Sequence, residues 1–129
     1  MREPIRDRSR LEHILTAIDR VMAFVKNNSF DELSENDLVY YGIVKNIEIV
    51  GEAAYKLSQQ FRDAHPETPW KIIMKMRHVL VHDYYQIEKD EIRFVIDDDL
   101  PPLREQVTRY LSETDWEAWE NTPQNENES

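Results

Sequence analysis

The sequence has no cysteine, so disulfide bonds, thiolate metal sites and cysteine nucleophiles are excluded. Its only glycines are Gly42 and Gly51, too few for a glycine-rich phosphate loop or for the tight turns of an all-β fold. It also lacks a stretch typical of a signal peptide, and no apolar run approaches the roughly 18 to 20 residues that span a membrane. Because a chain of 129 residues can bury one hydrophobic core, these absences predict a single-domain, soluble, cytoplasmic protein.

Positive charge is in deficit, with 16 lysines and arginines against 26 aspartates and glutamates and a net charge of −10. Residues 112–129 carry acidic side chains but neither lysine nor arginine. An acidic surface repels phosphates, which argues against simple non-specific binding of nucleic acid. We expect an N-terminal arm at residues 1–8, a helical domain at 9–112 and a flexible acidic tail at 113–129. Two interpretations of the tail remain open: it is simply a solvated segment, or it has a function and repels nucleic acid or docks a basic partner.

Apolar residues recur every three or four positions, which is the period of amphipathic helices. Four long segments have this pattern, and in the last of them two adjacent prolines force a kink or a new start. The segments are residues 10–27, 37–61, 70–82 and 89–111. Together they predict an all-α fold, an up-and-down bundle of four main helices whose last helix is broken by Pro101-Pro102.

Local signals place some of the helix ends. Ser29 and Glu32 have the spacing of a capping box, and Ser34 and Asp37 repeat that spacing at the next helix start. Thr68 is a candidate cap for the third segment, and the proline after it suits a first helical turn.

Small residues interrupt the second segment at Gly51, Ala53 and Ala54. They allow another helix to approach closely, so we interpret Gly51 as a packing device rather than a helix break.

The stretch "RHVLVHDYY", residues 77–85, places many titratable side chains at the end of the third segment. One interpretation is a metal site, since His78 and His82 are four residues apart and share a helix face. The HExxH pattern is absent, however, and the chain has only four histidines from which to draw further ligands. A purely structural interpretation pairs Arg77 with an acid such as Glu52 and packs the tyrosines on the bundle.

Phosphodiester chemistry is a third interpretation. His82 can move a proton near neutral pH, while Arg77 can hold a phosphate and stabilise its charged transition state. A spacing of five residues puts the two side chains roughly 140° apart on an ideal helix. They converge if the helix ends near His82 or if a symmetric dimer brings two copies of the segment together.

The segment "VKNIEIVGEAAYKLSQQFRDAHPETPWKIIMKMRHVLVHDYY" resembles the central signature of the HepT-like branch of the HEPN superfamily. Within it, Arg77, His82 and Tyr84 match the R-x4-H-x-Y motif of HEPN domains. "IEIVGEAA", "HPETPW" and the late "DDDLPPL" match in the same order. The similarity covers about residues 9–112.

This resemblance implies a HEPN-type helical bundle, a homodimer and a metal-independent endoribonuclease, the toxin of a type VII-like toxin–antitoxin pair. It implies that the R-x4-H site lies at the dimer interface, where Arg77 binds phosphate and His82 is the acid and base. The implied partner is a minimal nucleotidyltransferase antitoxin that transfers AMP to Tyr84 and so blocks RNA by bulk and charge. No cofactor and no metal are implied, and RNA, with tRNA as one candidate, is the implied substrate.

Two positions depart from the family pattern. Many relatives have asparagine after the motif arginine, where this chain has His78, and Tyr85 offers a second hydroxyl beside Tyr84. We therefore count His78, Asp83 and Tyr85 as accessory candidates. The alternative function is a non-catalytic helical module that binds the nucleotidyltransferase.

Overall fold

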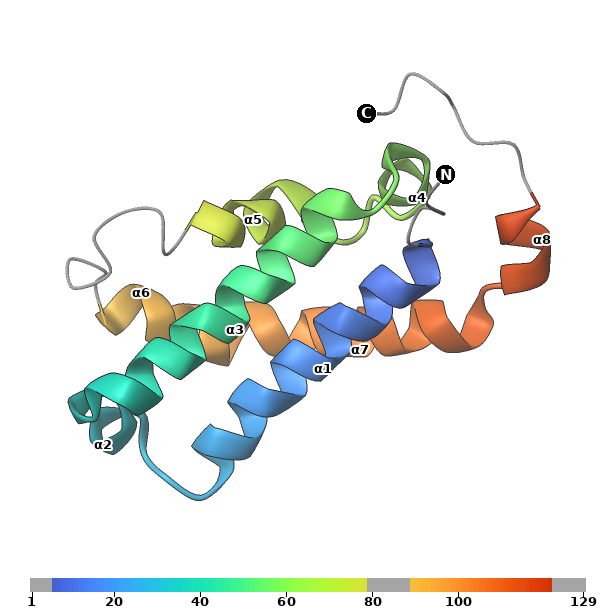
Figure 1. The fold of residues 1–129 in the computed structure, drawn as a ribbon. Coiled ribbons are helices and arrows are strands. Elements are labelled where there is room, and N and C mark those ends of the chain that lie inside the picture. Colours follow the sequence, from blue (N-terminus) through green and yellow to red (C-terminus); the bar gives the residue numbers. More distant parts are fainter. Residues whose placement is uncertain (1–5, 79–88, 122–129) are drawn as a thin grey trace, which may run out of the picture.

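The computed structural model describes residues 6–78 and 89–121, and the regular structure in these ranges is helical (Figure 1). This confirms the prediction of an all-α helical bundle. None of the described helices is long and apolar enough to cross a membrane. The elements are α1 (Asp7–Lys26), α2 (Phe30–Glu35), α3 (Asp37–Lys56), α4 (Gln59–Ala64), α5 (Trp70–Lys75), the 3₁₀ turn η1 (Met76–His78), α6 (Lys89–Phe94), the π turn η3 (Val95–Asp99), α7 (Leu100–Glu113) and α8 (Trp116–Glu120).

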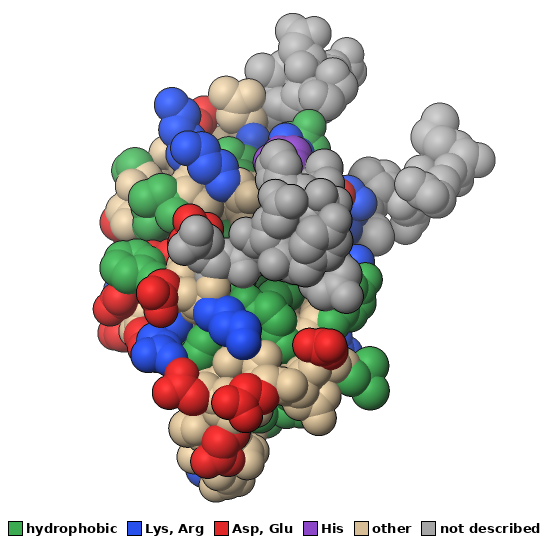
Figure 2. Space-filling view, turned by 90° about the vertical axis from the view of Figure 1, so that its left-hand side faces the viewer, with side chains coloured by type: hydrophobic (Ala, Val, Ile, Leu, Met, Phe, Trp, Pro, Cys, Tyr) green, Lys and Arg blue, Asp and Glu red, His purple; other side chains and the backbone are tan. Residues whose placement is uncertain are grey.

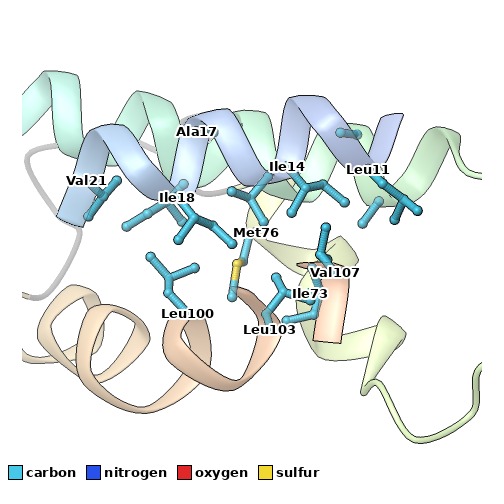
Figure 3. Packing of buried hydrophobic residues seen from close by; sticks show 14 of the residues in the cluster. Leu11, Ile14, Ala17, Ile18, Val21, Ile73, Met76, Leu100, Leu103 and Val107 are labelled. Atoms are coloured by element: carbon cyan, nitrogen blue, oxygen red, sulfur yellow. The ribbon is translucent and has the colours of Figure 1, made fainter. Parts of the chain in front are cut away.

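The long helices α1, α3 and α7 enclose the core. α1 packs against both α3 and α7, and α3 also packs against α5 and η1 (Figure 1). Leu11, Ile14 and Ile18 of α1 face Leu103 and Val107 of α7 across the apolar interior, and all five side chains are buried (Figure 3). The apolar period of residues 10–27 thus predicted α1 correctly.

The caps around α2 follow only part of the prediction. Ser29 Oγ accepts a hydrogen bond from the Glu32 backbone N–H at 3.2 Å, as the capping-box spacing predicted. Ser34 does not cap the next helix, because it lies inside α2, where its hydroxyl donates to the Asp31 carbonyl oxygen. Asn36 takes that role, and its side-chain oxygen accepts from the Val39 N–H.

The predicted single helix over residues 37–61 is wrong, because the chain breaks between α3 and α4. Ser58 has an extended backbone, and its Oγ caps α4 by accepting from the Phe61 N–H. The Asp7 carboxylate, at the start of α1, accepts from the Ser58 N–H at 2.7 Å and from its hydroxyl at 2.8 Å. This long-range pair satisfies the polar groups that the helix break exposes.

Thr68 does not cap α5, which corrects the capping prediction for the third segment. The residue is 2% exposed, and its hydroxyl donates to Gln106 Oε1 and is hydrogen-bonded to the Tyr110 hydroxyl. Pro69 stands at the N-cap position of α5, which has no side-chain cap. Thr68 is therefore used to join the α4–α5 connection to α7.

The two prolines lie at the start of a new helix, which follows a widened helical turn. η3 is a π turn in which the Leu100 N–H donates to the Val95 carbonyl oxygen, five residues back. Pro101 and Pro102 then occupy the first turn of α7. Proline lacks an N–H and its ring crowds the carbonyl four residues earlier, so the wider turn leaves room for both rings.

Part of the segment that we expected to be a flexible tail is helical. α8 places Trp116 on Phe61, with ring centroids 6.1 Å apart and planes inclined by 13°. Trp119 Nε1 donates to the Asp7 carboxylate at 3.0 Å, and Arg6 forms an ion pair with Glu120 at 2.6 Å. Aromatic burial therefore orders residues 116–120 despite their acidity.

Candidate functional site

The polar stretch 77–85 begins where α5 tightens into η1. Arg77 and His78 belong to η1 and are described, whereas His82, Asp83, Tyr84 and Tyr85 lie outside the described residues. The geometry of the candidate site is therefore built around Arg77.

Met76 anchors the start of the site in the core. Its side chain is buried and extends between α1 and α7, near Ile14 and Leu103 (Figure 3). Arg77 follows directly and is half-buried, and His78 is exposed. The buried Met76 side chain anchors this turn in the core, and the Arg77 side chain beside it reaches the surface.

Gly51 brings α3 close to this turn. A Cβ atom at Gly51 would lie 2.2 Å from the Arg77 backbone nitrogen and 2.6 Å from the Met76 carbonyl carbon. No side chain fits at these distances, so only glycine permits the observed approach of the two backbones. The prediction that Gly51 is a packing device is confirmed, and its partner is the backbone of the candidate site.

The Arg77 guanidinium lies over the ring of Tyr55, with Cζ 3.4 Å from the ring centroid. Tyr55 is on α3, one turn after Gly51, and it is 48% exposed. The face of an aromatic ring attracts a cation without neutralising its charge. Arg77 is thus held by a neutral surface.

The imidazole of His78 holds a second edge of the guanidinium. Arg77 Nε donates to His78 Nε2 at 3.2 Å, so that ring nitrogen acts as an acceptor in this arrangement. Among residues 6–78 and 89–121, no hydrogen bond or ion pair involves Arg77 Nη1 or Nη2. These terminal nitrogens carry the paired donors that match two phosphate oxygens.

The pairing of Arg77 with Glu52, part of the structural interpretation, is not observed. Glu52 forms its ion pair with Lys56 at 3.3 Å, on the exposed side of α3. For the metal interpretation, no three His, Asp or Glu side chains of the described part of the chain come together as a ligand set. His78 Nε2 faces a cationic guanidinium, which opposes a metal ion at that nitrogen.

The charge around this end of the molecule is mixed. Figure 2 shows basic side chains scattered among acidic and hydrophobic ones, with acidic side chains gathered toward the bottom of the view. Lys71 and Lys75, on α5, are exposed. RNA bound here would meet individual cations rather than one continuous basic surface.

Sequence reasoning missed Tyr55. The available signal was its spacing, since a residue four positions after a close-approach glycine lies on the same helix face, one turn further on. Tyr55 also belongs to the quoted signature segment, but in this part of it only Gly51, Ala53 and Ala54 were considered for packing.

Comparisons with known proteins agree with the resemblance noted in the sequence. The family model described as "Ribonuclease HepT-like" matches residues 14–110. A protein of Caldanaerobacter subterraneus subsp. tengcongensis, named "Putative RNase", is 35% identical over 101 residues, which cover 78% of this chain and 90% of the relative. A "Putative RNase" of Methanocaldococcus jannaschii is 29% identical over 97 residues, covering 75% and 89%.

A third relative, from Thermococcus cleftensis, carries the name "Probable ribonuclease HepT" and is 28% identical over 94 residues, covering 73% of this chain and 86% of the relative. No solved structure matches the chain. The family match spans most of the chain, and these relatives align along most of their own length. The chain belongs to the Ribonuclease HepT-like family.

Proposed function

We propose that this chain is an endoribonuclease that cleaves RNA without a metal ion, with Arg77 and His82 as its catalytic residues. The observation that carries the proposal is the family match, which includes the R-x4-H stretch. The half-buried Arg77, whose terminal nitrogens have no partner among the described residues, supports it further.

The proposed reaction is an attack of an RNA 2′-hydroxyl on the adjacent phosphorus. The 2′-oxygen–phosphorus bond forms, the bond from phosphorus to the 5′-oxygen breaks, and the products end in a 2′,3′-cyclic phosphate and a 5′-hydroxyl. The proton of the attacking hydroxyl is lost and the leaving 5′-oxygen gains one, so no net proton is consumed; His82 takes the first proton as base or gives the second as acid, and water carries out the other transfer. Arg77 Nη1 and Nη2 bind two phosphate oxygens and stabilise their growing negative charge.

The first experiment incubates the purified protein with total tRNA in EDTA, next to Arg77→Ala and His82→Ala. Cleavage by the wild type alone, with cyclic phosphate ends, is the expected result. Activity in either folded variant would contradict the residue's role. Loss of all activity in EDTA, restored by a divalent cation, would contradict the metal-independent mechanism.

We further propose that the active form is a homodimer with sites shared between the two copies, since Arg77 and His82 are five positions apart and do not converge on one straight helix. Mixing Arg77→Ala with His82→Ala tests this directly. In a shared site, each mixed dimer regains one intact Arg–His pair, so random mixing restores about a quarter of the wild-type rate. If both residues act within one subunit, the mixture stays inactive.

The regulation that we propose is adenylylation of Tyr84 by a minimal nucleotidyltransferase antitoxin. An AMP group on this motif tyrosine would obstruct RNA by its bulk and repel the RNA phosphates by its charge. Incubation with that partner and ATP should add one AMP mass to the wild type and to Tyr85→Phe, but not to Tyr84→Phe. An adduct on Tyr84→Phe would assign the modification to another residue.

The net charge of −10 favours a second candidate, a non-catalytic module that only binds the nucleotidyltransferase. It predicts partner binding, by gel filtration of the mixed proteins, without RNA cleavage at any RNA class tried. The His82→Ala variant separates the two functions, since it should still bind the partner but no longer inhibit growth.

A further inference from the structure

The guanidinium of Arg77 has no carboxylate partner among the described residues, yet a phosphate-binding arginine needs a defined orientation. A carboxylate would hold it by using its donors and neutralising its charge. The nearest acid considered from the sequence, Glu52, is engaged with Lys56 instead. Within residues 6–78 and 89–121, the groups that orient it are therefore ones that leave the charge intact.

Two such groups are in contact with the guanidinium. The ring of Tyr55 covers one face, with Cζ 3.4 Å from the centroid, and His78 Nε2 accepts from Nε at 3.2 Å. The face and the Nε edge are thereby occupied. The remaining edge, with Nη1 and Nη2, is the one that forms paired hydrogen bonds with two oxygens.

The ring itself is well placed to act as a support. It stands on α3, one turn beyond Gly51, where the α3 and η1 backbones touch. The Tyr55 carbonyl oxygen also accepts from Arg62 Nη1 at 2.9 Å, which ties the last turn of α3 to α4. The backbone under the ring is thus fixed at both sides of Tyr55.

We propose that Tyr55 is a positioning residue for the ribonuclease reaction: its ring face holds the Arg77 guanidinium with Nη1 and Nη2 directed to the scissile phosphate, while His78 sets its rotation. The inference rests on the proposed function and adds a residue outside the R-x4-H motif. The aromatic ring makes the contact with the guanidinium, so the Tyr55 hydroxyl is dispensable for this role.

The geometric half of the proposal is tested without catalysis. In ¹⁵N-labelled protein, the Arg77 Nε–Hε signal is assigned by its loss in Arg77→Lys. Ring currents from Tyr55 should shift this signal, so Tyr55→Leu should move it and Tyr55→Phe should leave it in place. An unmoved signal in Tyr55→Leu would show that the ring does not hold the guanidinium.

The functional half uses single-turnover cleavage of RNA in EDTA. Tyr55→Leu should lower the rate by roughly 2- to 30-fold, the range for losing one cation–π contact, and Tyr55→Phe should retain it. In the Arg77→Ala background, Tyr55→Leu should cause no further loss. An equal loss in both backgrounds would mean that Tyr55 acts on RNA directly or on the fold, and a slow Tyr55→Phe would assign the role to the hydroxyl.

Tyr41→Leu is the matched control, because Tyr41 is a similarly exposed tyrosine on the same helix, 43% against 48%. It lies about four turns, or roughly 21 Å, before Tyr55 on an ideal helix. It should change neither the Arg77 signal nor the rate. An inactive wild type would contradict the proposed function alone, since the Nε–Hε signal decides the positioning claim by itself.

Discussion

Two arginines, Arg62 and Arg77, pack against the end of α3 and are used in opposite ways. Arg62 Nη1 lies 3.2, 2.9 and 2.8 Å from the carbonyl oxygens of Ala54, Tyr55 and Leu57, three acceptors at the helix end. Among the described residues, Arg77 contacts an aromatic face and a neighbouring imidazole, and its Nη donors have no partner there. Both are half-buried, so burial alone does not separate a structural cation from one available to a ligand.

The largest effect should come from removing the available arginine. Arg77→Ala should slow RNA cleavage by about 100- to 1,000-fold, the usual cost of deleting a donor to a charged transition state. Its unfolding free energy in urea should fall by no more than about 1 kcal/mol, the cost of an exposed cation–π contact, since no described ion pair is lost. Arg77→Lys should also fail, because an ammonium cannot form the paired hydrogen bonds. A wild-type rate of RNA cleavage in a folded Arg77→Ala variant would contradict the difference drawn between Arg77 and Arg62.

Gly51→Ala should disturb the contact that brings Arg77 to Tyr55. The new Cβ would lie 2.2 Å from the Arg77 nitrogen, so we expect a loss of about 1–3 kcal/mol in the free energy of unfolding, typical of overpacking. Gly42 is the control on the same helix, because a Cβ there meets nothing within 4 Å. Gly42→Ala should be neutral or gain up to about 1 kcal/mol from helix propensity. Equal effects in thermal or urea melts would contradict the close approach.

Arg62→Met should show the reverse pattern to Arg77→Ala. The methionine keeps an apolar stem but removes the guanidinium donor from the carbonyl oxygens of Tyr55 and Leu57, and it leaves Ala54 only its backbone donor, which should cost about 1–3 kcal/mol of unfolding free energy. At a temperature where the variant is folded, its cleavage rate should match the wild type. A loss of rate without a loss of stability would assign Arg62 to the site as well.

A partly buried carboxylate, Asp99, should give the smallest of the predicted changes in stability. Burial, with a further contribution from Asp98, raises the pKa of Asp99 above its ordinary value of 3.8. The folded state then binds this proton more tightly than the unfolded state, so stability falls as pH rises through the interval between the two pKa values. Asp99→Asn should be more stable than the wild type near neutral pH. The gain should vanish below the ordinary pKa, where Asp99 is protonated in both states.

Periodicity and local spacing were enough to predict α1 and one cap. α1 follows from its apolar stripe, and the Ser29 cap follows from a glutamate three residues later, because both signals are confined to one helix. Gly51 was also interpreted correctly from small neighbours on one face. Its actual partner, the backbone at Met76 and Arg77, was not predicted, since it lies 25 residues away in the sequence.

Two of the errors share a physical cause, which is competition from distant partners. Ser58 ends α3 because Asp7 receives its donors across 51 residues, and Thr68 leaves the cap of α5 for Tyr110 across 42 residues. Neither pairing has a local sequence signature. In the site, the motif named Arg77, but the ring that contacts it came from the fold, because an exposed tyrosine on a helix looks the same whether or not a cation lies above it.

The Asp7 carboxylate, which accepts from Ser58 and from Trp119 Nε1, also has a consequence for where the domain ends. It joins the first turn of α1, the α3–α4 junction and α8 through one side chain. The segment shared with the family, residues 14–110, contains neither Asp7 nor the tryptophans of α8. The packed unit is therefore longer than the segment that the family model matches, and shortening the chain to residues 14–110 would remove the tryptophan rings that cover Phe61.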